Sequence, residues 1–356
     1  MSRRWFLPII LIILSLISLA LVRTLAPELL MKQAMIIFGC SGLFVFCSLI
    51  PFKKWLEQAN KLYFFSCFSL VLPLLLNQQT RDTARWIKFG TFFQLQPSQL
   101  AFPLIGLALI VWLVKHPPNR LFNQLRAWLL IILPGLLIVI EPNLSTTLFF
   151  FSVMGILIFL AGLPIKHLLI IAVACVSFGL LGWQTWLRPY QRERIVSFID
   201  AQKASADQNY NAQQALIAVG AGGWWGQGWG SGSQSKLAFL PEKHTDFIFA
   251  AFAEQFGLIG SIILLAIYIS LVIFLWKQAS YLHQPAAKLF LYLVATMLAI
   301  QTFIAVGTNI GLLPITGLTL PILSTGGSSL LTYSLCFGIT QNLIKTIRNP
   351  AQTFLV

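Results

Sequence analysis

Carboxylates are scarce in this sequence, and a group of them marks the stretch best suited to chemistry. The chain of 356 residues has ten Asp and Glu, and three of them, Glu242, Asp246 and Glu254, lie within thirteen positions of one another. An apolar run follows Asp246, so a helix that begins there would carry Glu254 about 12 Å along its axis. An ionisable side chain at that depth is costly and is by default a functional candidate. Asp246 would also suit a helix N-cap beside Thr245, so capping and chemistry are equal alternatives for it at this point.

His244 precedes Asp246 by two positions and is a second group that could transfer protons. In an extended segment the two side chains would share a face. Histidine titrates near neutral pH and acts as a general base in many enzymes. It is as often an interface residue, so the sequence favours a structural or substrate-contact role for His244.

The composition indicates that a polytopic membrane protein positions these groups. Hydrophobic residues make up 57% of the chain, charged residues make up 10%, and the mean hydropathy is +0.81, which leaves too little polar surface for a soluble domain of this length. The net charge of +14 comes from basic residues spread singly between apolar runs, which indicates orientation in a membrane and no nucleic-acid partner. The five cysteines lie inside apolar runs without metal-ligand spacing, so neither a disulfide framework nor a zinc site is expected.

Ten apolar runs are long enough to cross about 30 Å of hydrocarbon. They cover 5–22, 33–50, 62–76, 99–114, 127–140, 146–163, 167–187, 247–276, 286–308 and 327–344. The first lacks a clear cleavage site and is interpreted as a retained helix and not a signal peptide. With the N-terminus inside, the cytoplasmic segments hold thirteen basic residues and the short outer loops hold five, as the positive-inside rule requires.

We therefore expect an all-α polytopic membrane protein of ten transmembrane helices, with both termini cytoplasmic. It would form one integral membrane domain over residues 1–356, with a large extracytoplasmic loop, 188–246, between helices 7 and 8. Residues 141–143 are expected to form a tight outer hairpin, because one kinked helix there would invert the charge asymmetry downstream. The run 247–276 is longer than a span needs and contains Gly257 and Gly260, so it is expected to tilt or bend.

The predicted outer loops carry the remaining polar groups. The loop 77–97 has two arginines, a lysine and Trp86, which taken alone suits an anchor at headgroup depth. The segment 188–200 combines basic and apolar residues in a pattern typical of an amphipathic interfacial helix. The stretch GAGGWWGQGWGSG at 220–232 matches no phosphate-binding fingerprint and is predicted to be a turn-rich interfacial loop. The segment 309–329 is too apolar for a solvated loop and too rich in Pro and Gly for a helix, so it is expected to re-enter the protein.

Taken together, these stretches closely resemble the SEDS family, the shape, elongation, division and sporulation proteins. The motifs that carry the resemblance span nearly the whole chain. They are RWIKFG at 85–90 with QPS at 96–98, PNLST at 142–146, YNAQQALIAVGAGGWWGQGWG at 210–230, LPEKHTDFIFAAFAE at 240–254 and GLLPITGLTLPILSTGGSS at 311–329. Within the family, the stretch that leads into LPEKHTDFIF is more similar to the rod-shape elongation members than to the division members.

The resemblance implies a peptidoglycan glycosyltransferase of the bacterial inner membrane that polymerises lipid II into glycan strands on the outer face during wall elongation. It implies Asp246 as the catalytic base, and the departing pyrophosphate suggests a divalent cation, Mg or Mn, held in part by Asp246. The implied partners are a class B penicillin-binding protein, which is a transpeptidase, lipid II, undecaprenyl-linked glycan, the elongation machinery and the membrane itself. The residues expected to bind substrate are Arg85, Trp86, Lys88, Arg192, Arg194, Lys243, His244, Glu254, Ser328 and Ser329.

Four positions depart from the pattern of the family. Gln99 and Phe102 stand where the family usually has an acid and a lysine, Asn143 replaces an aspartate, and Gln255 replaces the second acid of a Glu–Glu pair. Because both members of a Glu–Lys pair are replaced together, the changes look coordinated. Two alternative functions therefore stay open, a lipid II flippase and a non-catalytic scaffold for the penicillin-binding protein, although few ionisable groups lie within the inner half of the helices for a transport route.

Overall fold

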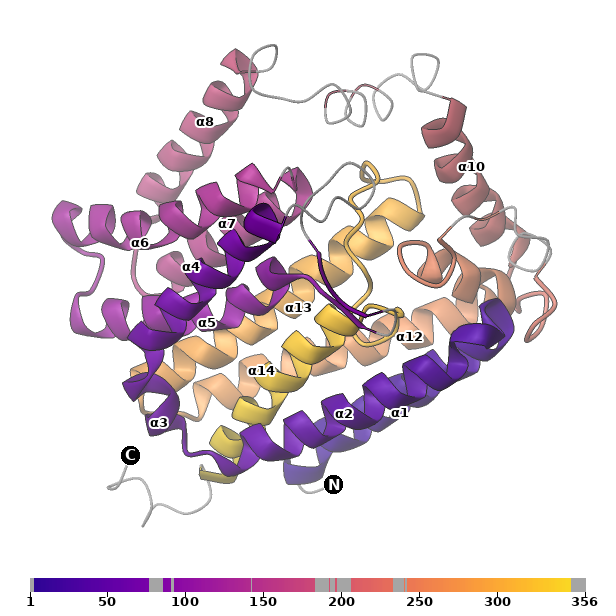
Figure 1. Ribbon diagram of the computed structural model, residues 1–356, viewed down its shortest axis with the longest axis horizontal. Helices are drawn as coiled ribbons and strands as arrows, with labels where there is room; N and C mark the ends of the chain where they lie inside the picture. Colours follow the sequence, from indigo (N-terminus) through magenta and orange to yellow (C-terminus); the bar gives the residue numbers. More distant parts are fainter. Residues whose placement is uncertain are drawn as a thin grey trace.

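The computed structural model of the chain is a bundle of long helices with a small two-stranded sheet (Figure 1). It describes residues 3–76, 86–90, 93–141, 143–182, 206–232, 240 and 242–346, together with 192 and 196. The helices are α1 (Arg3–Leu25), η1 (Pro27–Leu29), α2 (Leu30–Leu49), α3 (Phe52–Glu57), α4 (Ala59–Leu76), α5 (Pro97–Lys115), α6 (Leu121–Ile140), α7 (Leu144–Leu160), α8 (Ile165–Leu181), α10 (Ala206–Ala221), α12 (Ile248–Ser280), α13 (Pro285–Asn309) and α14 (Gly327–Thr346). The strands are β1 (Ile87–Phe89) and β2 (Phe93–Leu95), which pair antiparallel.

Each of the ten predicted runs coincides with a helix. Among the described residues, seven helices are long and apolar enough to cross a membrane, namely α1, α2, α4, α5, α6, α12 and α13, and α7 and the first part of α8 are shorter apolar helices. The predicted hairpin at 141–143 is confirmed as a connection between two separate helices, because α6 ends at Ile140 and α7 begins at Leu144. The predicted amphipathic helix at 188–200 lies outside the described residues, apart from 192 and 196.

Besides the short helices η1 and α3, helix α10 and the β1–β2 hairpin were not predicted from the sequence. Helix α10 occupies part of what was expected to be a long loop, and its run of alanines and glutamines has high helix propensity without the apolar length that marks a span. The hairpin β1–β2 pairs Ile87 with Leu95 and Lys88 with Gln94. Its strands of three residues are too short to leave a clear alternating pattern.

Polar bonds between helix ends define two ends of the bundle. The Gln341 amide of α14 donates to the Arg4 carbonyl of α1 at 2.8 Å, and the Asn342 amide donates to the Ser48 carbonyl of α2 at 3.1 Å. We refer to this end, where α1 begins and where α2 and α14 end, as the terminal end. We refer to the opposite end, where α5, α12 and α14 begin and α13 ends, as the loop end. The start of α1 and the end of α14 therefore lie on the same side of the bundle.

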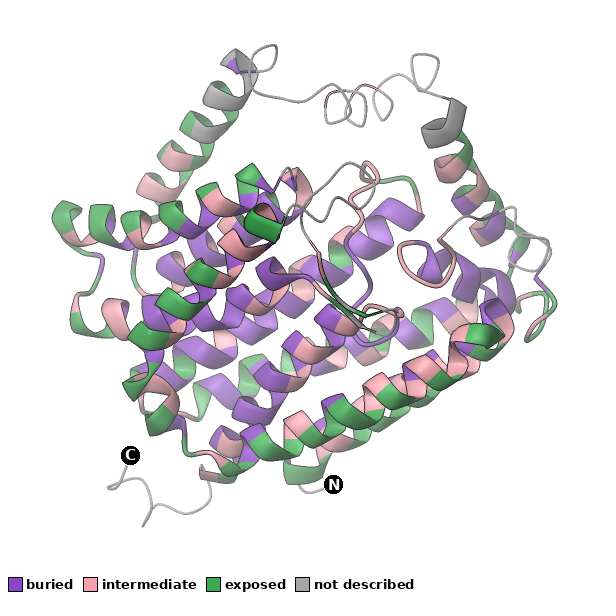
Figure 2. Ribbon diagram, viewed as in Figure 1, coloured by how far each residue is buried: buried purple, intermediate pink, exposed green. Residues whose placement is uncertain are grey.

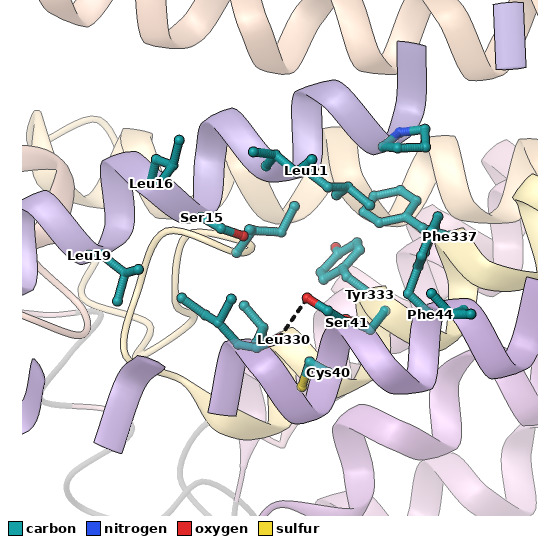
Figure 3. Close-up of a pocket in the computed structure, with 16 residues that line it drawn as sticks. Leu11, Ser15, Leu16, Leu19, Cys40, Ser41, Phe44, Leu330, Tyr333 and Phe337 are labelled. Atoms are coloured by element: carbon teal, nitrogen blue, oxygen red, sulfur yellow. Dashed lines mark hydrogen bonds between the residues drawn. The ribbon is translucent and has the colours of Figure 1, made fainter. Parts of the chain in front are cut away.

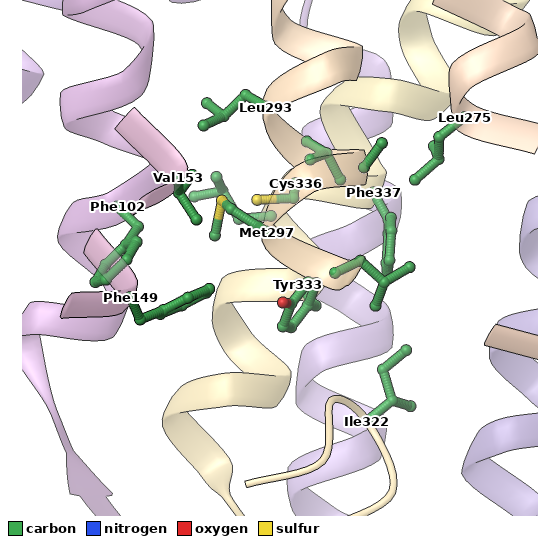
Figure 4. Close-up of a cluster of buried hydrophobic side chains, with 14 of the residues drawn as sticks. Phe102, Phe149, Val153, Leu275, Leu293, Met297, Ile322, Tyr333, Cys336 and Phe337 are labelled. Carbon is green, nitrogen blue, oxygen red and sulfur yellow. The ribbon is translucent and has the colours of Figure 1, made fainter. Parts of the chain in front are cut away.

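Helices α5 and α13 form its centre. In an apolar stretch of 18 residues in each of these two helices, 72% is buried, compared with 11–33% in the other helices of spanning length. Figure 2 shows the same contrast between central and peripheral helices. Phe102 of α5 stacks on Phe149 of α7 with ring centroids 4.8 Å apart, and it meets Phe150 edge-on at 5.1 Å. Tyr333 and Met297 continue this core toward α14 and α13 (Figure 4). Because lipid is as apolar as these side chains, close packing and internal hydrogen bonds hold the helices together.

Candidate functional site

The turn that carries Asp246 is held by its backbone. Residues 242–247 form consecutive turns before α12, and Asp246 is partly exposed. The carbonyl of Asp246 accepts a hydrogen bond from the Asn309 amide at 2.8 Å, and the carbonyl of Thr245 accepts one from the Ser324 hydroxyl at 2.9 Å. The carbonyl of His244 accepts from both the backbone N–H and the hydroxyl of Thr325, at 3.0 and 2.9 Å. Three successive carbonyls are thus bonded to the last residue of α13 and to the segment that joins α13 to α14.

Asn309 is the residue that connects this turn to the helix after it. Its side-chain oxygen accepts from the Ala250 N–H of α12 at 2.9 Å, while its nitrogen also donates to Ala305 of its own helix at 2.7 Å. It is 1% exposed, so these bonds form away from solvent. The N-cap of α12 is Phe247, which makes no side-chain cap bond. The structure thus places the N-cap one residue after Asp246, and Asn309 satisfies an N–H of the first turn from a neighbouring helix.

The predicted re-entrant segment returns into the bundle, as expected. Residues 310–326 contain no helix, and Leu323 and Ser324 are buried. The Ser18 hydroxyl of α1 donates to the Leu323 carbonyl at 2.7 Å. A Cβ placed on Gly317, whose φ is +70°, would lie 3.6 Å from a carboxylate oxygen of Asp246, so the Asp246 side chain faces this segment. The re-entrant segment thus forms one wall beside Asp246.

Glu254 lies inside α12, close to a break in that helix. It is fully buried, and the break falls three residues later at Gly257, which has φ 68° and ψ −167°. We call residues 222–232 the Gly-Trp loop; it docks against this break. Two N–H groups of the loop, those of residues 227 and 228, donate to the carbonyls of residues 254 and 255 before the break, at 2.9 and 3.1 Å. In return, the N–H groups of residues 258 and 259 after the break donate to the loop carbonyls of residues 223 and 224, at 2.9 and 3.2 Å.

The Gly-Trp loop therefore replaces the helical bonds that the break removes. A Cβ on Gly226 or on Gly257 would clash with the backbone of the other segment, and a Cβ on Gly232 would clash with the Glu254 carboxylate. This close approach explains the density of glycines in a stretch that was predicted only as a turn-rich loop. Trp224 and Trp225 are exposed at 67% and 80%, which agrees with an interfacial position for the loop. The predicted bend in 247–276 is confirmed at Gly257.

Ser328 and Ser329 are buried at the loop end. The Ser328 hydroxyl accepts from the Gln96 N–H at 2.8 Å and donates to the Gln94 carbonyl at 3.2 Å. Ser329 is 3.4 Å from the Gln301 amide nitrogen. Ser328 therefore fixes the β1–β2 hairpin against the start of α14, and this hairpin carries Lys88.

The structure brings several of the predicted residues to the loop end. Lys243, His244 and Asp246 share one turn, and the partly exposed Trp86 and the exposed Lys88 lie on or next to the hairpin bound by Ser328. Arg85 and Arg194 lie outside the described residues, and Arg192 is an isolated described position. Among the residues described, no group of three His, Cys, Asp or Glu side chains could hold a metal ion.

These features of the loop end match a known group of proteins. The sequence pattern of the FtsW/RodA/SpoVE family, described as cell cycle proteins, matches residues 3–349. The chain belongs to this family. The probable peptidoglycan glycosyltransferase FtsW of Saccharophagus degradans is 36% identical over 296 residues, which are 79% of this chain and 74% of that protein. The peptidoglycan glycosyltransferase MrdB of Escherichia coli is 33% identical over 300 residues, which are 83% and 80% of the two chains.

Solved structures agree with this assignment. A peptidoglycan synthase complex, described for its structural coordination of polymerization and crosslinking, contains a chain that matches with a TM-score of 0.85 at 27% identity, over 97% of this chain and 98% of that chain. The rod shape determining protein RodA of Thermus thermophilus matches with a TM-score of 0.73 at 25% identity, over 97% of both chains. The resemblance inferred from the motifs is therefore confirmed.

The residues that depart from the family pattern make neutral contacts. Asn143 caps α7, because its side chain accepts from the Thr146 N–H at 3.3 Å. Gln255 lies 3.2 Å from the Thr24 hydroxyl of α1 and accepts from the Gly230 N–H at 3.1 Å. The last of these contacts ties the Gly-Trp loop to α12, and Trp229 of the same loop donates to the Ala20 carbonyl of α1 at 3.2 Å.

Gln99 and Phe102, where this family member lacks an acid and a lysine, line the same small cavity. Its volume is about 10 Å³, and Gln301, Ser329 and Tyr333 also contact it. The Gln99 side-chain oxygen is buried without a hydrogen-bond partner. Phe102 fills the neighbouring space with its stacked ring. A neutral amide and an aromatic ring thus occupy positions where an ion pair would have to lie in the interior.

Four residues of the site were missed by the sequence analysis. Asn309, Ser324 and Thr325 lie near the ends of apolar runs and Gln301 lies inside one, where single polar side chains give no pattern. The Gln301 amide donates to the Thr319 carbonyl at 2.8 Å, and its oxygen accepts from Tyr333 at 2.9 Å. Their partners lie 18–81 positions away in the chain, so neighbouring residues gave no signal.

An apolar groove opens between α1, α2 and α14 (Figure 3). Its volume is about 410 Å³. Leu11 and Leu19 of α1 form one wall, and Phe44 of α2 and Phe337 of α14 form the other. Ile322 of the re-entrant segment also lines it, so the groove reaches the segment that forms the wall beside Asp246. Its lining is suited to a hydrocarbon chain.

Proposed function

We propose that this family member polymerises lipid II into peptidoglycan glycan strands, as a peptidoglycan glycosyltransferase of the bacterial inner membrane. The observation that carries the proposal is the fixed turn of Asp246, whose backbone carbonyls at 244, 245 and 246 are bonded to the last residue of α13 and to the segment that follows it. The names of the FtsW and MrdB relatives support the reaction. A carboxylate with a fixed backbone and a partly exposed side chain suits a general base.

The reaction requires one proton transfer and one leaving group. A sugar hydroxyl of one lipid-linked substrate attacks the anomeric carbon of the other, and Asp246 accepts the hydroxyl proton as the new glycosidic bond forms. The bond from the anomeric carbon to the pyrophosphate breaks, and undecaprenyl pyrophosphate leaves with its bonding electrons. Lys243 and Lys88, with Arg85, Arg192 and Arg194, are the cations available to stabilise the phosphate charge. A divalent cation held by Asp246 would add Lewis-acid stabilisation of the same oxygens.

The remaining residues are assigned to substrate positioning. Trp86 and His244 would contact the sugar or its carrier, and Glu254 would fix the Gly-Trp loop or the substrate from inside α12. Ser328 and Ser329 would act through the hairpin and the polar cluster that they hold. The lipid tails would lie in grooves between helices, of which the groove beside Ile322 is one that reaches the wall beside Asp246.

The proposed topology has ten transmembrane helices with both termini cytoplasmic and the loop end outside. It is supported by the coincidence of ten helices with the ten apolar runs and by the charge asymmetry of the sequence. A class B penicillin-binding protein is the proposed partner, since a matching solved structure belongs to a synthase complex of polymerization and crosslinking. Service in wall elongation is the proposed role, within a family whose matching relatives include FtsW and MrdB.

The first test is polymerisation of labelled lipid II by the purified protein with its penicillin-binding partner, in magnesium or manganese. Wild type is expected to form glycan strands, and Asp246→Asn, which keeps the size of the side chain, is expected to form none. Glu28→Gln is the matched control, because Glu28 is an exposed acid in η1, which packs on α1 and α2 at the loop end. Undiminished polymerisation by Asp246→Asn would contradict the role of the base.

The two other functions give different results in the same preparation. A scaffold would give no strands from either protein, while Asp246→Asn would still complement cell shape. A flippase would move labelled lipid II across reconstituted vesicles at a rate that depends on this protein. Strand formation by wild type together with its loss in the variant supports the polymerase against both.

A further inference from the structure

A basic and aromatic cluster lies at the terminal end, where α5 meets α6. We define it as Trp112, Lys115, His116, Arg120, Phe122 and Arg126. Helix α5 starts at the loop end and is 19 residues long, so its last residue lies about 28 Å away at the terminal end. The cluster is therefore remote from Asp246 and belongs to the opposite face of the membrane.

The turn that carries the cluster is rigid. The Asn123 amide donates to the Pro117 carbonyl and the Gln124 amide donates to the Pro118 carbonyl, both at 2.9 Å. The His116 ring stacks on Trp112 with centroids 4.0 Å apart and planes at 19°. These contacts fix the backbone between α5 and α6, and with it the Cα positions of the basic residues in the turn.

Arg126 is held by aromatic rings and by no acid. Its guanidinium carbon lies 4.0 Å from the Phe122 ring centroid and 5.9 Å from that of Trp112. A guanidinium over a ring face keeps the N–H donors at its edge available for the oxygens of an anion. No acidic residue occurs in the sequence between Asp82 and Glu141, and among the described residues no ion pair involves Arg126. Its positive charge is therefore not neutralised within its own hairpin.

The face of α6 that carries Arg126 points to lipid. Phe122, Leu125 and Leu129, at four positions before, one before and three after Arg126, are exposed at 60%, 54% and 62%. Arg126 is the sixth residue of α6, about 8 Å along its axis from the start. A long basic side chain at this depth extends toward the helix end to reach the headgroups. The Arg126 guanidinium stacks on Phe122, which lies one turn nearer the start of α6, so the side chain extends toward that end.

We infer that this cluster binds the phosphate of an anionic phospholipid, in the leaflet opposite to Asp246. The anionic oxygens available at this depth of a bilayer are those of lipid phosphates, and Arg126 offers paired donors to them. Lys115 and Arg120 are both exposed on the same turn, so they favour a headgroup with net negative charge over a zwitterionic one, whose ammonium they repel. The inference goes beyond the glycosyltransferase function and does not depend on it.

The test measures lipid retention and thermal stability of the full-length purified protein in neutral detergent, with phosphatidylglycerol or phosphatidylcholine added. Wild type is expected to retain phosphatidylglycerol in native mass spectra and to gain a higher Tm from it than from phosphatidylcholine. Arg126→Gln is expected to bind phosphatidylglycerol about tenfold more weakly, since one charge-assisted pair is lost. Arg126→Lys should recover part of the affinity, because the charge returns without the planar fork.

Two controls separate this site from general attraction of lipid to positive charge. Lys277→Gln removes a basic residue in the last turn of α12, also at the terminal end, and should leave the phosphatidylglycerol effect unchanged. If Arg126→Gln does not fold, Lys115→Gln/Arg120→Gln leaves the aromatic stack intact and should also weaken binding. Equal phosphatidylglycerol effects in wild type and both variants would overturn the inference. So would an equal Tm gain from inorganic phosphate, which would identify a free-anion site instead.

Discussion

Replacing Asn309 tests whether the turn of Asp246 must be fixed for catalysis. Asn309→Ala removes three bonds, to Ala250, Asp246 and Ala305, with lengths of 2.9, 2.8 and 2.7 Å. The bonds to the two carbonyls contribute about 1 kcal/mol each, and the unsatisfied Ala250 N–H costs about 1–3 kcal/mol, so the expected loss of stability is about 3–5 kcal/mol. The released carbonyl of Asp246 lets the carboxylate move, and a displacement of about 1 Å lowers the rate about 100-fold.

The assay is lipid II polymerisation alongside thermal unfolding of the same preparations. Asn342→Ala is the matched control, because its amide makes a single carbonyl bond of 3.1 Å to Ser48 at the terminal end. It should lower Tm and leave the polymerisation rate of the folded protein close to wild type. The reasoning would be refuted if Asn309→Ala polymerised at the wild-type rate. It would fail equally if Asn342→Ala lost as much activity, since the effect would then be one of general stability.

Three further predictions test other parts of the site. Gly257→Ala places a side chain at φ 68° against the backbone of the Gly-Trp loop. It should cost at least about 3 kcal/mol of stability in thermal unfolding. The control Gly42→Ala, which has open space around it, should cost no stability. Ser328→Ala leaves the buried Gln96 N–H without its acceptor; a Tm loss equivalent to about 1–3 kcal/mol is expected, and an unchanged Tm would contradict the bond. Gln99→Glu and Phe102→Lys should each lower the stability of the protein by about 3–5 kcal/mol, because each buries a charge without a partner. The double variant should lose less than the sum of the two single losses, because the new charges would pair. If the Tm loss of the double variant equals the sum of the single losses, the two positions do not interact.

The helices were predictable because their signal is long and local. A bilayer requires a long apolar stretch in each span, and an apolar run marks each of these helices in the sequence itself. The bend at Gly257 was predictable for the same reason, since an apolar run of 30 residues with two glycines exceeds the membrane thickness. Helix α10 was not, because a polar helix of this length has no property that separates it from a structured loop.

The candidate site was predictable only where its residues form a motif. Asp246 and Glu254 stood out because carboxylates are rare in apolar sequence, and the motif around them led to the family. The partners that fix the turn gave no such signal, since Asn309 is 63 positions from Asp246 and Thr325 is 81 positions from His244. A hydrogen bond across that separation depends on which helices are neighbours, and no local pattern contains that information.

The Asn309 side chain also links the start of α12 to the turn of Asp246. Its oxygen accepts from the Ala250 N–H in the first turn of α12, and its nitrogen donates to the Asp246 carbonyl. Helix α12 therefore depends on α13 for its start, and Asn309→Asp tests that dependence at constant size. Its second oxygen would face the carbonyls of residues 246 and 305, so the variant should lose polymerisation above the pKa of the new carboxyl and recover it below. A rate that is independent of pH would argue against a role of the Asn309 amide in holding the turn.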